Sequence, residues 1–197
     1  MTTFFLMRHG LTEWNRDKRI QGQTDIPLCD EGRDMAREWA RSLAGTAFDR
    51  ILTSDLARAV ETGELVNAGR DLPMSRDARL REQEWGRWTG LSKPELLAMR
   101  AELDRQEALG FGFQPPGGED RETVLWRACD ALLEFSETHP GDRVLVVTHS
   151  GVLKCLLYAL SGMEFLPAER SPLRPYRLHR VECVDMELAP GEFNMEL

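Results

Sequence analysis

The chain has 197 residues, 42% of them hydrophobic and 29% charged, a balance typical of one globular domain with a substantial core. Its formal net charge of −8 argues against a general nucleic-acid binder, which would need a basic face. The charge leaves anionic substrates open, because a few arginines in one cleft reverse the local potential. No apolar stretch approaches the roughly 18 residues that a membrane-spanning helix needs, so we expect no membrane partner.

Apolar runs and helical patterns alternate along the chain. This order predicts an α/β fold, a three-layer sandwich with a mostly parallel central sheet and helices on both faces, in a single domain over residues 1–197. Strands are expected at 3–8, 48–53, near 74, at 142–148 and at 176–188, the last antiparallel at an edge. Helices are expected from an Asp30 cap through Leu43, from a Ser54 or Asp55 cap to Asn67, over 94–109 and 121–138, and up to Leu160. Residues 80–90 are predicted to be irregular, and 110–118 to form a mobile loop at a rim.

The amino-terminal segment and the cysteines indicate a cytoplasmic protein. No basic segment precedes the first apolar run, and Arg8 interrupts that run early, so a secretory signal is not expected. The cysteines stand singly, without Cys-x-x-Cys spacing, and are expected to be reduced thiols that hold no metal: Cys29, Cys129, Cys155 and Cys183.

The first strand ends abruptly in Arg8-His9-Gly10. Ligands collect at strand ends of open α/β sheets, an arginine offers a permanently charged fork for phosphate, and a histidine can act as a base or nucleophile. Asn15 and the backbone at Gln21-Gly22 could reach the same anion if the loop folds back over the strand end. The tripeptide alone fits an ordinary turn equally well, so phosphoryl chemistry is a hypothesis that needs the other segments.

A second segment, Ser54 to Thr62, combines a strand end with a capped helix and contains Arg58. Such a junction makes an anion site from backbone N–H groups at the helix start. An arginine on a helix is more often a solvated surface residue, so Arg58 by itself indicates little.

A third segment, Leu80 to Gly90, holds two carboxylates and two tryptophans in an irregular stretch. A carboxyl group against an indole can be kept protonated and can then act as a general acid. Glu82 and Glu84 are the candidates. The alternative is that Trp85 and Trp88 pack in the interior while the glutamates are exposed.

A fourth segment, Thr148-His149-Ser150-Gly151, is again a strand end that leads into a helix. Two strands of one sheet that both end in histidine and small residues suggest that His9 and His149 lie on opposite sides of one phosphoryl group. His139 is expected at a helix terminus and His179 on a strand surface, neither with a chemical role.

These segments together resemble the histidine phosphatase superfamily, the phosphoglycerate-mutase-like proteins. The motif residues occur in the family's order across residues 5–151: Arg8, His9, Gly10, Asn15, Arg58, Glu82 and His149. Gly117-Gly118-Glu119, followed by Arg127, also resembles a segment of this family. The resemblance implies that His9 is the nucleophile, Glu82 the proton donor, and Arg8, Arg58 and His149 the groups that hold the transferred phosphoryl group. It implies phosphate binding by Arg8, Asn15, Gln21, Gly22, Arg58, His149, Ser150 and Gly151.

No zinc-type spacing and no carboxylate cluster accompanies these residues, so neither a metal nor another cofactor is expected. Arginines, an imidazolium and helix N-terminal amides can neutralise the charge on the phosphoryl oxygens instead.

The remaining question is which reaction follows. Phosphoglycerate mutases of this type are longer between the proton donor and the second histidine, whereas residues 100–118 here contain Arg100 and Arg105 but no Arg-Arg pair. We therefore expect a phosphatase similar to α-ribazole phosphatases and broad-specificity phosphomonoesterases, acting on a small phosphorylated substrate as a monomer or homodimer. A mutase is the alternative. A non-catalytic phosphate-binding module is another, but it would be expected to lack His9 or Glu82.

Overall fold

The sheet is built on two buried apolar strands, β1 (Thr2–Arg8) and β4 (Arg143–Thr148). The computed structural model describes all 197 residues and arranges the strands in the order β3-β2-β4-β1-β5-β6. The others are β2 (Arg50–Thr53), β3 (Met74–Arg76), β5 (His179–Val184) and β6 (Glu187–Pro190). The four strands β3, β2, β4 and β1 are parallel, and β5 and β6 form an antiparallel edge.

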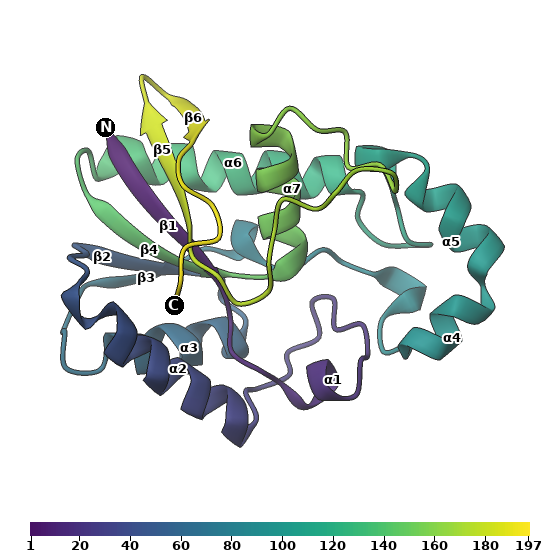
Figure 1. The fold of residues 1–197 in the computed structure, drawn as a ribbon, viewed down its shortest axis with the longest axis horizontal. Helices are drawn as coiled ribbons and strands as arrows, with labels where there is room; N and C mark the ends of the chain where they lie inside the picture. Colours follow the sequence, from purple (N-terminus) through teal and green to yellow (C-terminus); the bar gives the residue numbers. More distant parts are fainter.

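Helices cover both faces of this sheet (Figure 1). Helices α2 (Asp30–Ser42) and α3 (Ala57–Asn67) lie on one face, and α6 (Arg121–Thr138) and α7 (Ser150–Leu160) on the other. Three shorter helices lie toward one end of the molecule: α1 (Glu13–Arg16), α4 (Lys93–Ala98) and α5 (Arg100–Glu107). No helix combines the length and hydropathy that crossing a membrane requires. The predicted α/β three-layer architecture is thus confirmed.

Alternate side chains of the central strands belong to two separate cores. In β1, Phe4 and Leu6 pack with α6 and α7, whereas Phe5 and Met7 pack with α2 and α3. Successive side chains of a strand point to opposite faces, so a continuous apolar run can serve both layers. Residues of β4 alternate in the same way. Packing in the two cores therefore fixes the carboxyl ends of β1 and β4 side by side at one edge of the sheet.

Two helix starts differ from the sequence prediction. Asp30 is the first helical residue of α2 rather than its cap, and Leu56 precedes α3 in place of Ser54 or Asp55. The Ser54 hydroxyl accepts the Leu56 N–H at 3.3 Å, and Asp55 pairs with Arg81. The side chains of Ser54 and Asp55 therefore hold the turn between β2 and α3, and neither caps the helix.

Two longer predicted elements are divided. The helix expected over 94–109 is interrupted at Met99, whose φ of −100° and ψ of 31° separate α4 from α5. The strand expected over 176–188 is a hairpin of β5 and β6, because Asp185 and Met186 take φ values of 49° and 63°, the left-handed pair that suits a two-residue turn. The expected loop at 110–118 begins with a short 3₁₀ turn, Gly110–Gly112.

The prediction that His179 lies on a strand surface is wrong. Its side chain is 0% exposed, and its Nδ1 accepts the backbone N–H of Asn194 at 3.2 Å, so the carboxy-terminal segment covers it. Burial lowers the pKa of His179 to about 4. His139, by contrast, ends α6 as predicted.

Gly32 allows the loop after β1 to lie directly on the start of α2. A Cβ atom at this position would lie 2.0 Å from the carbonyl oxygen of Leu11, which is a backbone atom. We expect Gly32→Ala to lower the free energy of unfolding by about 2 kcal/mol, measured by urea denaturation. Gly45→Ala is the matched control, because a Cβ atom there meets nothing within 4 Å. Equal effects of the two substitutions would contradict this packing.

Candidate active site

His9 and His149 leave the sheet side by side. Arg8 and Thr148 are register partners at the ends of β1 and β4, and the backbone N–H of His9 donates to the Thr148 carbonyl at 3.0 Å. The two imidazole rings have their centroids 5.1 Å apart, and neither side chain is more than 1% exposed. The structure thus brings together the two histidines that the sequence placed at neighbouring strand ends.

The imidazole of His9 is held in one orientation. Its Nδ1 lies 2.7 Å from the Gly10 carbonyl oxygen, so Nδ1 carries the proton and donates it, and Nε2 keeps its lone pair. Burial, and then the charges of Arg8 and Arg58, hold the pKa of His9 well below its ordinary value. The ring is therefore neutral near pH 7, the state in which an imidazole is a nucleophile.

Arg58 is fully buried at the start of α3. Its guanidinium donates to the carbonyl oxygens of Thr24 at 2.8 Å and Gly22 at 2.9 Å, while its Nε has no partner. Burial lowers the pKa of Arg58 to about 10, which leaves the side chain charged at neutral pH. Thr62 ties this arginine to the loop after β1, since its hydroxyl donates to the Arg58 carbonyl and accepts the Gly10 N–H.

Further buried donors and acceptors at this sheet edge lack partners. Both ring nitrogens of His149 and the Nε of Arg8 form no hydrogen bond within the chain. Burial, and then the charge of Arg58, hold the pKa of His149 well below its usual range. The Arg8 guanidinium also lies 5.7 Å from the ring centre of Tyr176. Buried polar groups are normally satisfied, so these atoms indicate a ligand rather than a purely structural cluster.

A cavity of about 160 Å³ joins most of the predicted residues. Its wall consists of Arg8, His9, Asn15, Arg19, Ile20, Gln21, Gly22, Arg58, Glu82 and Trp85. Ser150 and Gly151 line a cavity on the other side of Glu82. Arginine side chains, two of them with unpartnered Nε atoms, line this candidate catalytic cavity. Such a wall suits a phosphate-sized anion.

Glu82 reaches this cavity from the irregular segment before α4. Both of its carboxylate oxygens accept the Gly151 backbone N–H, at 3.0 and 3.1 Å, at the start of α7. A Cβ atom on Gly151 would lie 2.1 Å from one of these oxygens, so glycine is required for this approach.

Arg127 of α6 supports the Glu82 segment. Its guanidinium pairs with Glu119 at 2.7 and 2.9 Å and donates to the Glu82 carbonyl at 3.2 Å. Gln83 donates to the Glu119 carbonyl at 2.7 Å. The resemblance pointed to Glu119 and Arg127 without a role for them. No signal along the chain shows that Arg127 binds the backbone of Glu82 or that Glu119 is its ion-pair partner.

The side chains of Glu84 and Asn15 form hydrogen bonds with residues close to them in the sequence. The Glu84 carboxylate accepts the Gly86 N–H at 3.1 Å and the Thr89 hydroxyl at 3.4 Å, which holds the turn after it. The Asn15 side chain accepts from the backbone and hydroxyl of Thr12 in a capping box at α1, and it also lines the catalytic cavity.

No cysteine lines the cavity around His9, and Glu82 is the acidic residue in its wall. All four cysteines are free thiols. No group of three or more His, Cys, Asp or Glu side chains is arranged to hold a metal ion.

The family comparison decides the class to which this site belongs. The sequence model of the histidine phosphatase superfamily (branch 1) matches residues 4–194. The chain belongs to the histidine phosphatase superfamily. A probable phosphoglycerate mutase GpmB from Cronobacter sakazakii is 33% identical over 186 residues, which cover 92% of this chain and 85% of that protein.

Solved structures show the same histidine phosphatase fold. Bacillus stearothermophilus YhfR matches with a TM-score of 0.89 and 32% identity, over 100% of this chain and 98% of that one. A mycobacterial glucosyl-3-phosphoglycerate phosphatase in complex with VO3 matches with a TM-score of 0.86 and 26% identity, over 98% and 99% of the two chains. An Escherichia coli protein that carries the name of an α-ribazole-5′-P phosphatase matches with a TM-score of 0.82 and 26% identity, over 98% and 96%. These matches confirm the expected resemblance to the phosphatase branch.

The contact between Gly151 and Glu82 gives a direct test. Gly151→Ala places a methyl group where the Glu82 carboxylate lies, and we expect phosphatase activity to fall on the order of a hundredfold, as when a general acid is lost. The free energy of unfolding should change little, because the displaced atoms end a flexible side chain. Gly112→Ala is the control, since its Cβ atom meets only an ordinary contact at 3.5 Å. Unchanged kcat in Gly151→Ala would show that this placement of Glu82 is not needed.

Proposed function

We propose that this histidine phosphatase hydrolyses phosphate monoesters of small metabolites through a phosphohistidine on His9. The observation that carries the proposal is the 2.7 Å contact between the Nδ1 of buried His9 and the Gly10 carbonyl oxygen. A carbonyl oxygen only accepts, so this contact assigns the ring proton to Nδ1 and leaves Nε2 as the nucleophilic nitrogen. The cavity wall beside it contains Arg8 and Arg58. A nucleophile next to fixed positive charge suits attack on a phosphoryl group.

In the first step, the Nε2 lone pair of His9 attacks phosphorus in line with the leaving oxygen. The bond from phosphorus to that oxygen breaks, and Glu82 supplies the proton that converts it to a neutral alcohol. Arg8, Arg58 and His149 stabilise the charge on the three equatorial oxygens. The buried nitrogen atoms without partners at Arg8, Arg58 and His149 support this assignment.

In the second step, water attacks the phosphohistidine. Glu82, now ionised, accepts a proton from the water, the bond between phosphorus and Nε2 breaks, and inorganic phosphate leaves. His9 returns to its neutral form, so no redox partner or further cofactor takes part. Asn15, Gln21 and the backbone at Gly22 complete the proposed phosphate site, whereas Ser150 and Gly151 lie on the other side of Glu82.

A mutase is the second candidate, and the name of the Cronobacter relative favours it. Return transfer requires groups that retain the released product against the phosphohistidine. In the segment between Glu82 and His149, Arg100 is paired with Asp104 at 2.7 Å and Arg105 is exposed. Neither arginine lines the catalytic cavity, and this arrangement favours hydrolysis. A non-catalytic module is disfavoured, because His9 and Glu82 are both present.

Substitution of the nucleophile tests the covalent step. His9→Ala should lower turnover by roughly 10⁴-fold or more, as removal of other covalent nucleophiles does. Rapid quench of the wild type with ³²P-labelled substrate should trap an acid-labile, base-stable adduct. His139→Ala, at the end of α6, is the control and should leave both results unchanged. An adduct that persists in His9→Ala would place the nucleophile elsewhere.

The identity of the proton donor is tested by the leaving group. Glu82→Gln should slow single-turnover phosphorylation by an alkyl phosphate on the order of a hundredfold, but slow an activated aryl phosphate far less, since an aryl oxygen hardly needs a proton. Glu84→Gln is the matched variant, because its carboxylate holds a turn, and it should show no such dependence. The reverse pattern would make Glu84 the donor.

Product analysis separates hydrolysis from transfer. With 3-phosphoglycerate and a 2,3-bisphosphoglycerate primer, the protein should release inorganic phosphate faster than it forms 2-phosphoglycerate. Both products are measured in one time course by ³¹P NMR. Efficient isomerisation with little release of phosphate would replace the phosphatase assignment with the mutase.

A further inference from the structure

Arg8 lines a second, smaller cavity besides the catalytic one, and we call it the His179 cavity. Its volume is about 60 Å³, roughly the share of two water molecules in the liquid, so it admits one small ion and no whole metabolite. The polar and charged residues in its wall are Arg8, Ser150, Arg174, Tyr176, Arg177 and His179. None of the functions described above uses this space.

The imidazole of His179 has one nitrogen atom without a partner. Its Nδ1 accepts the backbone N–H of Asn194 at 3.2 Å, and a backbone N–H only donates, so in the neutral ring Nε2 carries the proton. The ring is neutral near pH 7, because burial lowers the pKa of His179 to about 4. Its Nε2 is buried and forms no hydrogen bond within the chain. Buried donors are normally satisfied, so this N–H indicates an acceptor in the cavity.

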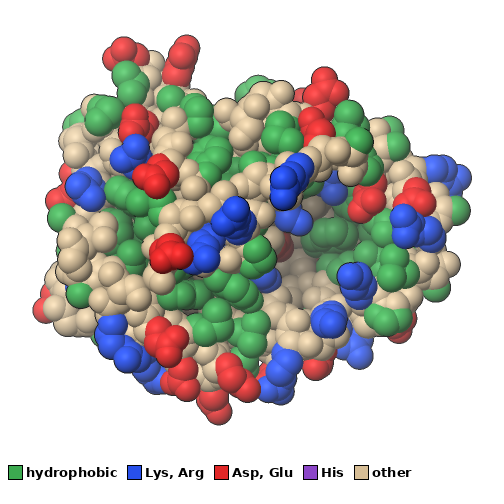
Figure 2. Space-filling view, viewed as in Figure 1, with side chains coloured by type: hydrophobic (Ala, Val, Ile, Leu, Met, Phe, Trp, Pro, Cys, Tyr) green, Lys and Arg blue, Asp and Glu red, His purple; other side chains and the backbone are tan.

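The charges in the wall of the His179 cavity have one sign. Three arginines line it, and no aspartate or glutamate does. The Nε of Arg8 has no partner, and Arg177 meets only the exposed Glu196 carboxylate, at 3.8 Å. Figure 2 shows basic side chains near the centre of this face, over the segment that leads from α7 to β5. Arg174 belongs to this segment and is exposed, so ions from the solvent can reach the cavity.

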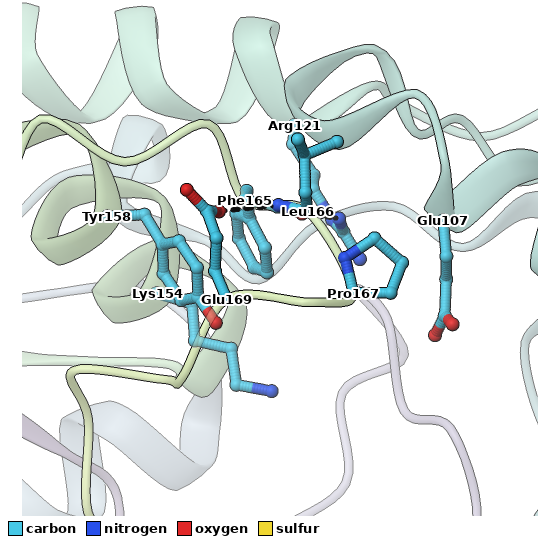
Figure 3. Close-up of a pocket in the computed structure, with 8 residues that line it drawn as sticks. All are labelled: Glu107, Arg121, Lys154, Tyr158, Phe165, Leu166, Pro167 and Glu169. Carbon is cyan, nitrogen blue, oxygen red and sulfur yellow. Dashed lines mark hydrogen bonds between the residues drawn. The ribbon is translucent and has the colours of Figure 1, made fainter.

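Another cavity with basic residues lies beside α7, and its charges are mixed. Figure 3 shows that its wall combines Arg121 and Lys154 with the carboxylates of Glu107 and Glu169. In the His179 cavity no carboxylate offsets the arginines. An anion with more than one negative charge therefore suits the His179 cavity better.

The carboxy-terminal segment holds the wall of the His179 cavity in place. The side-chain oxygen of Asn194 accepts the backbone N–H of Arg174 at 2.7 Å, and its amide nitrogen donates to the Pro172 carbonyl at 2.8 Å. The backbone N–H of the same asparagine orients His179. One residue thus fixes the imidazole donor and the backbone of the arginine beside it, so the site is formed before an anion binds.

We propose that the His179 cavity is a second anion site, which binds inorganic phosphate between Arg174, Arg177 and the Nε2–H of His179. Arg8 lines both this cavity and the catalytic one. One guanidinium does not neutralise two dianions, so phosphate in the His179 cavity weakens the binding of a phosphoryl group in the catalytic cavity. The binding itself does not depend on the proposed phosphatase function, whereas its effect on turnover does.

Phosphate titration followed by NMR tests the site directly. In the wild-type protein near neutral pH, the Nε2–H resonance of His179, assigned by its nuclear Overhauser effects to Phe193, should shift saturably with inorganic phosphate. The double variant Arg174→Met, Arg177→Met should raise the Kd read at His179 roughly tenfold or more, since charged hydrogen bonds are lost. Arg41→Met, at the exposed end of α2, is the matched control and should leave this Kd unchanged. Acetate should bind more weakly than phosphate, because it carries a single charge.

Three results of this titration would overturn the inference. No shift at His179 would mean that the cavity holds only water. The same Kd in the double variant as in the wild type would mean that the shift is transmitted from the catalytic cavity through Arg8. Tighter binding of acetate than of phosphate would mean that the site does not select a dianion.

The pattern of phosphate inhibition tests the effect on turnover. Phosphate in the catalytic cavity excludes the substrate and inhibits competitively, whereas phosphate in the His179 cavity weakens substrate binding without excluding it. The wild type should therefore show mixed inhibition, and the double variant competitive inhibition alone. Purely competitive inhibition of the wild type would overturn the coupling through Arg8. A protein without turnover of phosphate monoesters would refute the proposed phosphatase, while a saturable shift at His179 would retain the anion site.

Discussion

The parallel register between β1 and β4 is the constraint on which the site depends. Arg8 lies opposite Thr148, and one hydrogen bond of 3.0 Å from the His9 N–H to the Thr148 carbonyl carries this register past the end of β1. A slip of one residue would turn an imidazole to the opposite face of the sheet. The register is held by strand side chains that alternate between two dry cores. Packing that has no chemical role thus decides the spacing of the two histidines.

The second requirement is electrostatic. Burial of Arg58 costs free energy, because a charged group loses water, and the carbonyls of Gly22 and Thr24 replace only part of its hydration. His9 and His149 respond by staying neutral, with lowered pKa values. A bound phosphoryl group would supply the missing negative charge. The cavity is therefore positive although the chain has a net charge of −8. Charges within a few ångströms set the potential in the cavity, and the more distant acidic side chains at the surface are screened by salt.

The sequence was informative where local pattern and topology coincide. Strand ends follow from apolar runs, so the sequence alone predicts that His9 and His149 lie at one edge of a parallel sheet. The sequence pattern does not predict the position of a side chain that depends on contacts with a distant segment. His179 was expected at the surface because nothing local shows that Asn194 folds back over it. Arg127 looks like any helical arginine, and its role comes from a carboxylate and a backbone carbonyl that other segments supply.

Glu82 shows how an irregular segment can be as well fixed as a strand end. The Thr148 hydroxyl donates to the Leu80 carbonyl at 2.8 Å, Arg127 donates to the Glu82 carbonyl, and the Gly151 N–H holds the carboxylate itself. These anchors come from β4, α6 and α7, so elements distant in the sequence hold the carboxyl group at the cavity that His9 also lines. The position of the proposed proton donor therefore depends on contacts with three elements outside its own segment, and the sequence of residues 80–90 alone does not determine it.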